Sequence, residues 1–181
     1  MQQSLAQTTA LLSRTPATLD VLLRDLPEEW FRSPEGEKGW SASEVVSHLI
    51  TCEREVWIPR AKILLAFGGS RTFERFDREA SNRHAKGGAI AELLDGFSRV
   101  RAECLDELRS WNLQPEDFER RGVHPGLGSV TLGELLAAWA VHDLTHLHQI
   151  SRVLAHQYRG AVGSWGRYLG VLRCNGHGAS A

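Results

Sequence analysis

Apolar residues along the chain recur mainly at spacings of three and four, whereas the strict alternation that is typical of strands is scarce. This period matches the turn of an α-helix, so the pattern predicts an all-α protein. Long helices are expected at about residues 3–26, 41–67, 88–111 and 131–158. They would form a four-helix bundle with a short C-terminal tail helix, in which one face carries Trp165, Leu169 and Leu172.

Local signals mark where these helices begin, bend and end. Pro16 should kink or restart the first helix, and Pro59 should bend the second. The stretches "SASE", which begins at Ser41, and "TLGE", which begins at Thr131, each have the hydroxyl and the glutamate of a capping box. "FGGS" should end the second helix, and "YRGAVGS" should end the fourth.

The connection between the second and third helices, about residues 68–87, is long for a compact bundle. Because it contains Phe73, Phe76 and His84, we expect it to pack against the bundle. Its length also permits a crossover in place of a tight hairpin.

Composition narrows the class of protein. A chain of 181 residues suits one domain, and residues 1–181 are expected to form one. The formal net charge of −1, with no block of like charge, leaves no basic surplus for binding nucleic acid. No apolar run reaches membrane-spanning length, and the N-terminus lacks the features of a signal peptide. The chain's cysteines are scattered without CxxC spacing, as in reduced cytoplasmic proteins: Cys52, Cys104 and Cys174.

The stretch "AWAVHDLTHLHQISRVL", residues 138–154, carries three histidines in an otherwise apolar helix. His142 and His146 are four residues apart and therefore differ by only about 40° in direction. His148 points to nearly the opposite side. The pair lies in line with the helix's apolar stripe, which is formed by Leu135, Trp139, Ile150 and Val153.

Burying two imidazoles is costly unless their nitrogens find partners. Hydrogen bonds to other helices would serve, and so would a divalent metal, which a pair at this spacing often binds. In "WSASEVVSHLITCERE", His48 falls on the inner stripe of the second helix, where it can face the pair. Three neutral imidazoles would form a three-nitrogen site with open positions, as in catalytic more than in structural metal centres.

Two familiar metal motifs are excluded. Zincin proteases use HExxH, but "HDLTH" has Asp143 in place of the glutamate. Di-iron bundles use Glu-x-x-His, and no glutamate in this chain has a histidine three residues later.

Other residues are weaker candidates for the site. Gln149 could orient a ligand or a bound water, or could be a surface amide. His124, in the predicted loop "GVHPGLG", could line the mouth of a pocket, although an exposed loop histidine is the simpler interpretation. Cys52 could be a fourth ligand or a buried apolar residue. Asp143 is expected to be solvated. Cys174 and His177 are spaced like ligands but lie in a glycine-rich tail, which argues against a site there.

The stretches "WSASEVVSHL", "GVHPGLGSVTLGELL" and "HDLTHLHQI" together resemble the DinB/YfiT-like superfamily, and the likeness extends to the tail "AVGSWGRYLGVL". The resemblance implies a four-helix bundle in which His48, His142 and His146 bind a divalent metal such as zinc or nickel. Members with an assigned activity include transferases that use bacillithiol, mycothiol or glutathione, and a mycothiol-dependent isomerase. The family name refers to DNA damage induction and does not imply DNA binding.

The function expected from these features is that of a metal-dependent enzyme, with a thiol S-transferase acting on a small electrophile as the favoured interpretation. Metal-bound thiolate would attack the electrophile, whereas metal-bound hydroxide would instead hydrolyse an ester or amide. A non-catalytic bundle that binds a metal or ligand is the third alternative. Three nitrogen ligands suit zinc, nickel, cobalt or iron, and manganese is a further alternative. We expect a small-molecule substrate, a low-molecular-weight thiol as cosubstrate for the transferase, and a homodimer, with no nucleic acid or membrane partner.

Overall fold

The structure is a computed structural model that describes residues 4–36, 39–77 and 89–174. His84 and His177 lie outside these residues. The α-helices are α1 (Leu5–Leu12), α2 (Thr15–Leu23), α3 (Glu28–Arg32), α4 (Ala42–Cys52), α5 (Ile58–Phe67), α7 (Ile90–Ser110) and α8 (Leu132–Gln157). The two strands are β1 (Arg121–His124) and β2 (Gly128–Thr131). The remaining helical turns are η1 (Glu53–Trp57), η2 (Gly68–Ser70), η4 (Pro115–Glu119), η5 (Gly163–Tyr168) and η6 (Gly170–Leu172).

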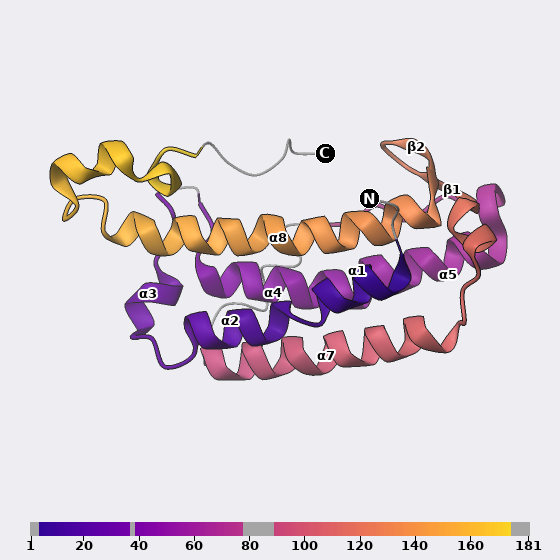
Figure 1. Ribbon diagram of the computed structural model, residues 1–181, viewed down its shortest axis with the longest axis horizontal. Coiled ribbons are helices and arrows are strands. Elements are labelled where there is room, and N and C mark those ends of the chain that lie inside the picture. Colours follow the sequence, from indigo (N-terminus) through magenta and orange to yellow (C-terminus); the bar gives the residue numbers. More distant parts are fainter. Residues whose placement is uncertain (1–3, 37–38, 78–88, 175–181) are drawn as a thin grey trace.

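The long helices run roughly side by side and form a four-helix bundle (Figure 1). Its four columns are α1 with α2, α4 with α5, α7, and α8, as the hydrophobic period predicts. The predicted all-α bundle is therefore confirmed. Among the described helices, none combines the length and the apolar character needed to cross a membrane.

The first column is broken where the sequence predicts a restart. α1 ends at Leu12, and α2 begins at Thr15, one residue before Pro16, which therefore lies in its first turn. A proline is tolerated there because the first-turn N–H groups have no partner within the helix. The break leaves the Leu12 carbonyl group available to another side chain, as described below.

The second column begins with the predicted capping box. The Ser41 hydroxyl accepts the Glu44 N–H, and the Glu44 carboxylate accepts the Ser41 N–H at 2.8 Å. The helix is continuous through the wider π-type turn η1, which comes just before Pro59. A π-turn suits this place because Pro59 has no N–H to donate and its ring would crowd the preceding turn of an α-helix. Gly68, with φ of 55°, ends the column as predicted.

A β-hairpin that the sequence pattern did not predict precedes α8. β1 and β2 pair antiparallel, with Arg121 opposite Thr131 and His124 opposite Gly128. Strands of four residues are too short to show a convincing alternation. The hairpin also holds the long connection, because the Phe73 N–H donates to the Val123 carbonyl at 2.9 Å.

The long connection packs against the bundle as expected, as far as it is described. Phe73 is buried and Phe76 is half-buried against the core. The tail after α8 is helical, but it consists of the 3₁₀ turns η5 and η6 and not of an α-helix, and η6 contacts α8. Trp165 is 73% exposed, so the predicted apolar face of the tail does not bury its largest member.

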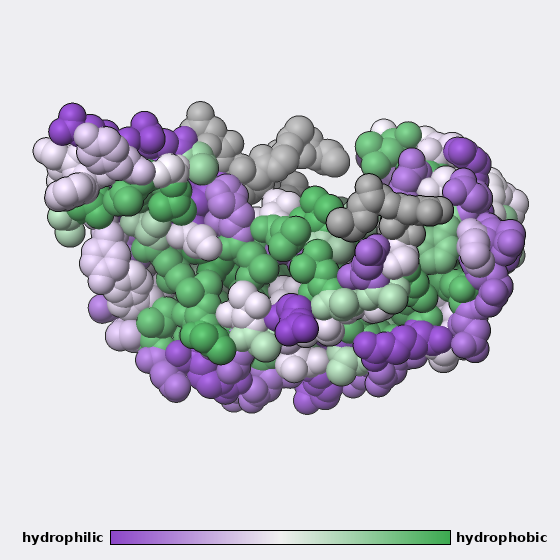
Figure 2. Space-filling model, viewed as in Figure 1, coloured by the Kyte–Doolittle hydropathy of each residue, from purple (hydrophilic) through white to green (hydrophobic). Residues whose placement is uncertain are grey.

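Two buried clusters of apolar side chains fill the bundle. Part of the apolar surface remains uncovered: Figure 2 shows hydrophobic side chains spread over α2 and α8. The exposed apolar residues of α1, α2 and α8 are Leu11, Val21, Val141 and Leu144.

Candidate metal centre

The structure brings together the three histidines that the sequence pattern singled out. His48 projects from α4, and His142 and His146 project from α8. The Nε2 atom of His142 lies 3.3 Å from Nε2 of His48 and 3.1 Å from Nε2 of His146. One ring nitrogen from each residue lies within 4.8 Å of the other two. His48 and His146 are buried and His142 is half-buried, so the group sits at the edge of the core.

The spacing of these nitrogens suits one divalent transition metal. A zinc–nitrogen bond is about 2.0–2.1 Å long, so two ligands in a tetrahedral site lie about 3.3–3.4 Å apart. The two shortest nitrogen–nitrogen distances in the group agree with this value to within a few tenths of an ångström. His148 is exposed on another face of the same helix, as its position predicted.

Gln149 fixes the orientation of one imidazole. Its Oε1 atom lies 2.7 Å from Nδ1 of His146, and the side chain is buried. A carboxamide oxygen can only accept a hydrogen bond, so the His146 proton belongs on Nδ1, and Nε2 keeps its lone pair for the centre of the cluster. Gln149 is therefore not a surface amide.

Aromatic rings enclose the cluster. Trp40 stacks on His146 with 6.5 Å between ring centroids and 3° between planes. Trp57 meets His142 edge-on at 5.1 Å, and Phe76 meets His48 at 5.8 Å. These rings pack against the imidazoles and restrict their rotation. From the sequence, Phe76 is expected only to pack against the bundle, and Trp40 is marked only by its place directly before the Ser41 cap.

Cys52 lies next to the cluster without belonging to it. Its Sγ atom is 3.4 Å from Nε2 of His48, one helical turn away on the same helix. The group of possible ligands found among the described residues holds the three histidines alone. Cys52 is buried, in keeping with a small apolar residue in the wall of the site.

A cavity of about 510 Å³ opens onto the cluster. Its wall includes His48, Cys52, Val56, Trp57, Arg60, Arg75, Phe76, His124, Pro125, Gly126 and His142. His124 ends strand β1, so it is not in a loop, and it is half-buried in this wall and not exposed. Its Nδ1 atom accepts the N–H groups of Gly126 at 3.1 Å and Leu127 at 3.2 Å. Burial, together with the nearby charge of Arg60, lowers the pKa of His124.

The expectation that Asp143 is solvated was wrong, because this residue is fully buried. Its carboxylate accepts hydrogen bonds from Arg101 at 2.6 and 2.9 Å and from the Thr15 hydroxyl at 2.6 Å. α8 is covered on this second side by α1 and α2, so a residue that points away from His142 does not reach water. A buried arginine makes the burial of this carboxylate feasible.

Arg101 joins Asp143 to a second buried carboxylate. Its guanidinium donates to Glu53 at 2.8 and 3.0 Å, and the Trp139 indole N–H donates to Glu53 at 2.8 Å. A further bond of 2.7 Å reaches the Leu12 carbonyl at the break between α1 and α2. Burial raises the pKa of Glu53, and Arg101 offsets part of that rise.

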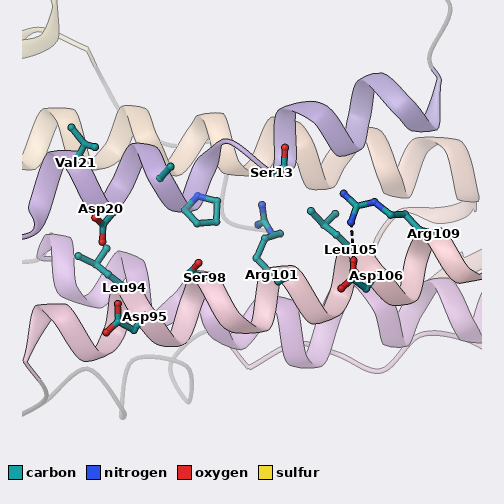
Figure 3. Close-up of a pocket in the computed structure, with 13 residues that line it drawn as sticks. Ser13, Asp20, Val21, Leu94, Asp95, Ser98, Arg101, Leu105, Asp106 and Arg109 are labelled. Atoms are coloured by element: carbon teal, nitrogen blue, oxygen red, sulfur yellow. Dashed lines mark hydrogen bonds and ion pairs between the residues drawn. The ribbon is translucent and has the colours of Figure 1, made fainter.

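Figure 3 shows Arg101 projecting from α7 toward this break, in the wall of a groove of about 440 Å³ between α2 and α7. No prediction from the sequence included this network, although a signal was present. Arg101 is four residues after Phe97 and Glu53 is four residues after Leu49, so each charge falls within an apolar stripe.

Comparisons with known proteins agree with this architecture. The sequence model of the DinB superfamily matches residues 11–150. No curated protein matches the chain. Among solved structures, YfiT from Bacillus subtilis is similar with a TM-score of 0.72 and 20% sequence identity, over 93% of this chain and 91% of that one. YfiT is described as a probable metal-dependent hydrolase with an unusual four-helix bundle topology. With a family match over most of its length, this chain belongs to the DinB superfamily.

Proposed function

We propose that this protein is a metal-dependent hydrolase in which His48, His142 and His146 hold one divalent transition metal. The observation that carries the proposal is the convergence of three imidazole nitrogens at metal-binding distances, beside a cavity large enough for a small molecule. The description of YfiT as a probable metal-dependent hydrolase supports it. Zinc and nickel are the expected metals, with iron, cobalt and manganese as alternatives.

When bound, such a cation supplies Lewis acidity, which polarises a carbonyl group and activates water. Hydrolysis then adds water across an acyl bond. The water oxygen bonds to the carbonyl carbon, the bond to the leaving oxygen or nitrogen breaks, and the leaving group takes up a proton. The chain contributes a rigid ligand set, since Gln149 and the surrounding rings hold the imidazoles in place.

We assign His124 the role of a hydrogen-bond donor to the substrate. Its Nδ1 atom accepts two backbone N–H groups, which places the proton of the neutral ring on Nε2. Its lowered pKa keeps the ring neutral near pH 7. His124 can therefore stabilise negative charge on a substrate or leaving-group oxygen, but its bonded Nδ1 does not serve as a base.

A thiol S-transferase is the second candidate for the same site. The observation that favours it is the cavity wall, in which the described residues include no carboxylate. Among these described residues, a thiolate would meet only cationic and neutral groups. In that reaction the sulfur bonds to the electrophilic carbon, and the leaving group departs with the bonding electrons.

The test uses protein purified without a histidine tag, and elemental analysis measures its metal content. Samples that have been chelated, and samples reloaded with metal, are then assayed with phenyl acetate esters. His146→Ala should lose the metal and the hydrolysis but keep its helical circular dichroism, whereas the exposed His148→Ala on the same helix should keep all three. Thiol conjugation without ester hydrolysis would favour the transferase. Less than about a tenth of an equivalent of metal, with no thermal shift on adding zinc or nickel, would refute the metal centre.

A further inference from the structure

Two arginines share the cavity wall with the histidines. Arg60 comes from α5, and Arg75 comes from the connection that follows it. Among the described residues that line the cavity, none is an aspartate or a glutamate. The described part of the wall therefore carries positive charge before any cation binds.

Arg60 is held in this wall without a carboxylate partner in the described parts of the chain. Its Nη2 atom donates to the Glu74 backbone carbonyl at 3.3 Å, and its guanidinium lies over the Phe73 ring at 5.6 Å. The Glu74 carboxylate lies 4.0 Å from Arg71. Burial lowers the pKa of Arg60, because the half-buried cation has lost water without gaining a counterion.

The other buried arginines of the chain show the contrast. Arg101 is paired with Glu53 and Asp143, and Arg152 is paired with Glu35 at 2.6 Å. Each of these two cations therefore has a carboxylate partner, whereas Arg60 faces a cavity. A guanidinium in that state binds an incoming carboxylate strongly, because the ligand supplies the charge-assisted hydrogen bonds that the protein lacks.

Arg60 also lies close to the reacting centre. It lines the same cavity as Cys52 and His124. Cys52 is in turn 3.4 Å from the His48 imidazole. Arg75, which is exposed, lines the same cavity and adds a second positive charge.

We infer that the substrate of the three-histidine centre carries a carboxylate, which Arg60 and Arg75 bind while the scissile acyl group lies at the histidines. This inference rests on the proposed hydrolase function. The guanidinium groups set which acyl compounds are accepted, and the histidine centre carries out the reaction. Neutral esters of the same shape are poorer substrates than the corresponding anions.

The kinetic test uses two esters that differ in charge, 4-acetoxybenzoate and methyl 4-acetoxybenzoate, with the metal-loaded protein. The ratio of their kcat/KM values, each divided by the uncatalysed rate, should favour the anion by about tenfold or more. Arg60→Gln and, separately, Arg75→Gln should each reduce this ratio several-fold. Arg159→Gln removes the same charge beyond the far end of α8 and should leave the ratio unchanged. Circular dichroism checks that each variant is folded, and the exposed Arg75 offers a substitution with little risk to folding.

A binding test separates this inference from the proposed function. Calorimetric titration with the ketone 4-acetylbenzoate, whose acetyl group cannot be hydrolysed, against the neutral 4-acetylbenzamide, should show tighter binding of the anion, which Arg60→Gln weakens about tenfold. If neither ester is hydrolysed but this difference holds, the hydrolase proposal fails and the anion pocket stands. If both esters are hydrolysed at equal relative rates, or if Arg60→Gln changes neither the ratio nor the binding, the inference is overturned and the hydrolase remains.

Discussion

Replacing Arg101 by methionine should strongly destabilise the protein. The substitution keeps an apolar stem of similar length but removes five hydrogen bonds, two to Glu53, two to Asp143 and one to the Leu12 carbonyl. Two carboxylates would then remain buried without a cation. Removing one partner of a buried ion pair costs about 3–5 kcal/mol. With an m-value of about 2 kcal/mol per molar urea, the midpoint of unfolding should fall by about 1.5–2.5 M.

The size of this loss should depend on pH. Burial already raises the pKa of Glu53, and Arg101 partly offsets the rise, so the substitution should raise the pKa further. A group whose pKa is higher in the folded state adds stability at low pH and loses it as pH rises through the folded-state value. The difference in unfolding free energy between Arg101→Met and the unaltered protein should therefore be smaller at pH 5 than at pH 8.

Urea denaturation of metal-free protein, followed by circular dichroism at both pH values, measures this difference. The matched control is Arg109→Met on the same helix, where an exposed arginine pairs with the exposed Asp106. That pair should contribute less than about 1 kcal/mol. If Arg101→Met costs no more than Arg109→Met, or if its cost is the same at pH 5 and pH 8, the buried network does not have the role argued for it.

Three further outcomes are expected. Gln149→Leu should weaken zinc binding about 10- to 100-fold in a competitive dye titration, because His146 loses the bond that orients it; unchanged affinity would contradict this. Trp139→Phe should lower the unfolding free energy in urea by about 2–3 kcal/mol, since Glu53 loses a buried donor, and a loss below about 0.5 kcal/mol would count against it. Gly122→Ala should cost about 1–3 kcal/mol in thermal unfolding, because a Cβ atom there would lie 3.2 Å from both Leu64 and Phe73. The control is Gly69→Ala, where a Cβ atom meets nothing within 4 Å.

The parts of the fold that the sequence predicts are those set by local chemistry. The capping boxes at Ser41 and Thr131, the restart at Pro16 and the end at Gly68 each depend on a few neighbouring residues, and each is observed. The hairpin before α8 was not predicted because contacts between distant parts of the chain hold its strands in place. The β1 backbone is hydrogen-bonded to Phe73, about fifty residues earlier in the sequence.

The candidate site shows the same division. Helical spacing alone places His142 and His146 side by side, and the inner stripe places His48 opposite them. The predicted exposure of Asp143 was wrong because the residues that surround it come from other helices, namely Thr15 on α2 and Arg101 on α7. A polar residue on the far side of a helix is solvated only if no other helix covers that side, and one sequence does not report such coverage.

The π-type turn η1 explains how one helical column supplies so much of the cavity wall. A regular α-helix turns about 100° per residue, so Arg60, twelve residues after His48, would point about 120° away from it. A π-turn inserts about one extra residue and turns everything after it back by about 100°. Arg60 then points to within about 20° of His48, and Trp57 turns toward His142, which it contacts. Pro59 favours this wider turn because it cannot donate the next α-helical hydrogen bond. The proline that a sequence pattern shows only as a bend thus helps to bring a cation into the wall of the histidine centre.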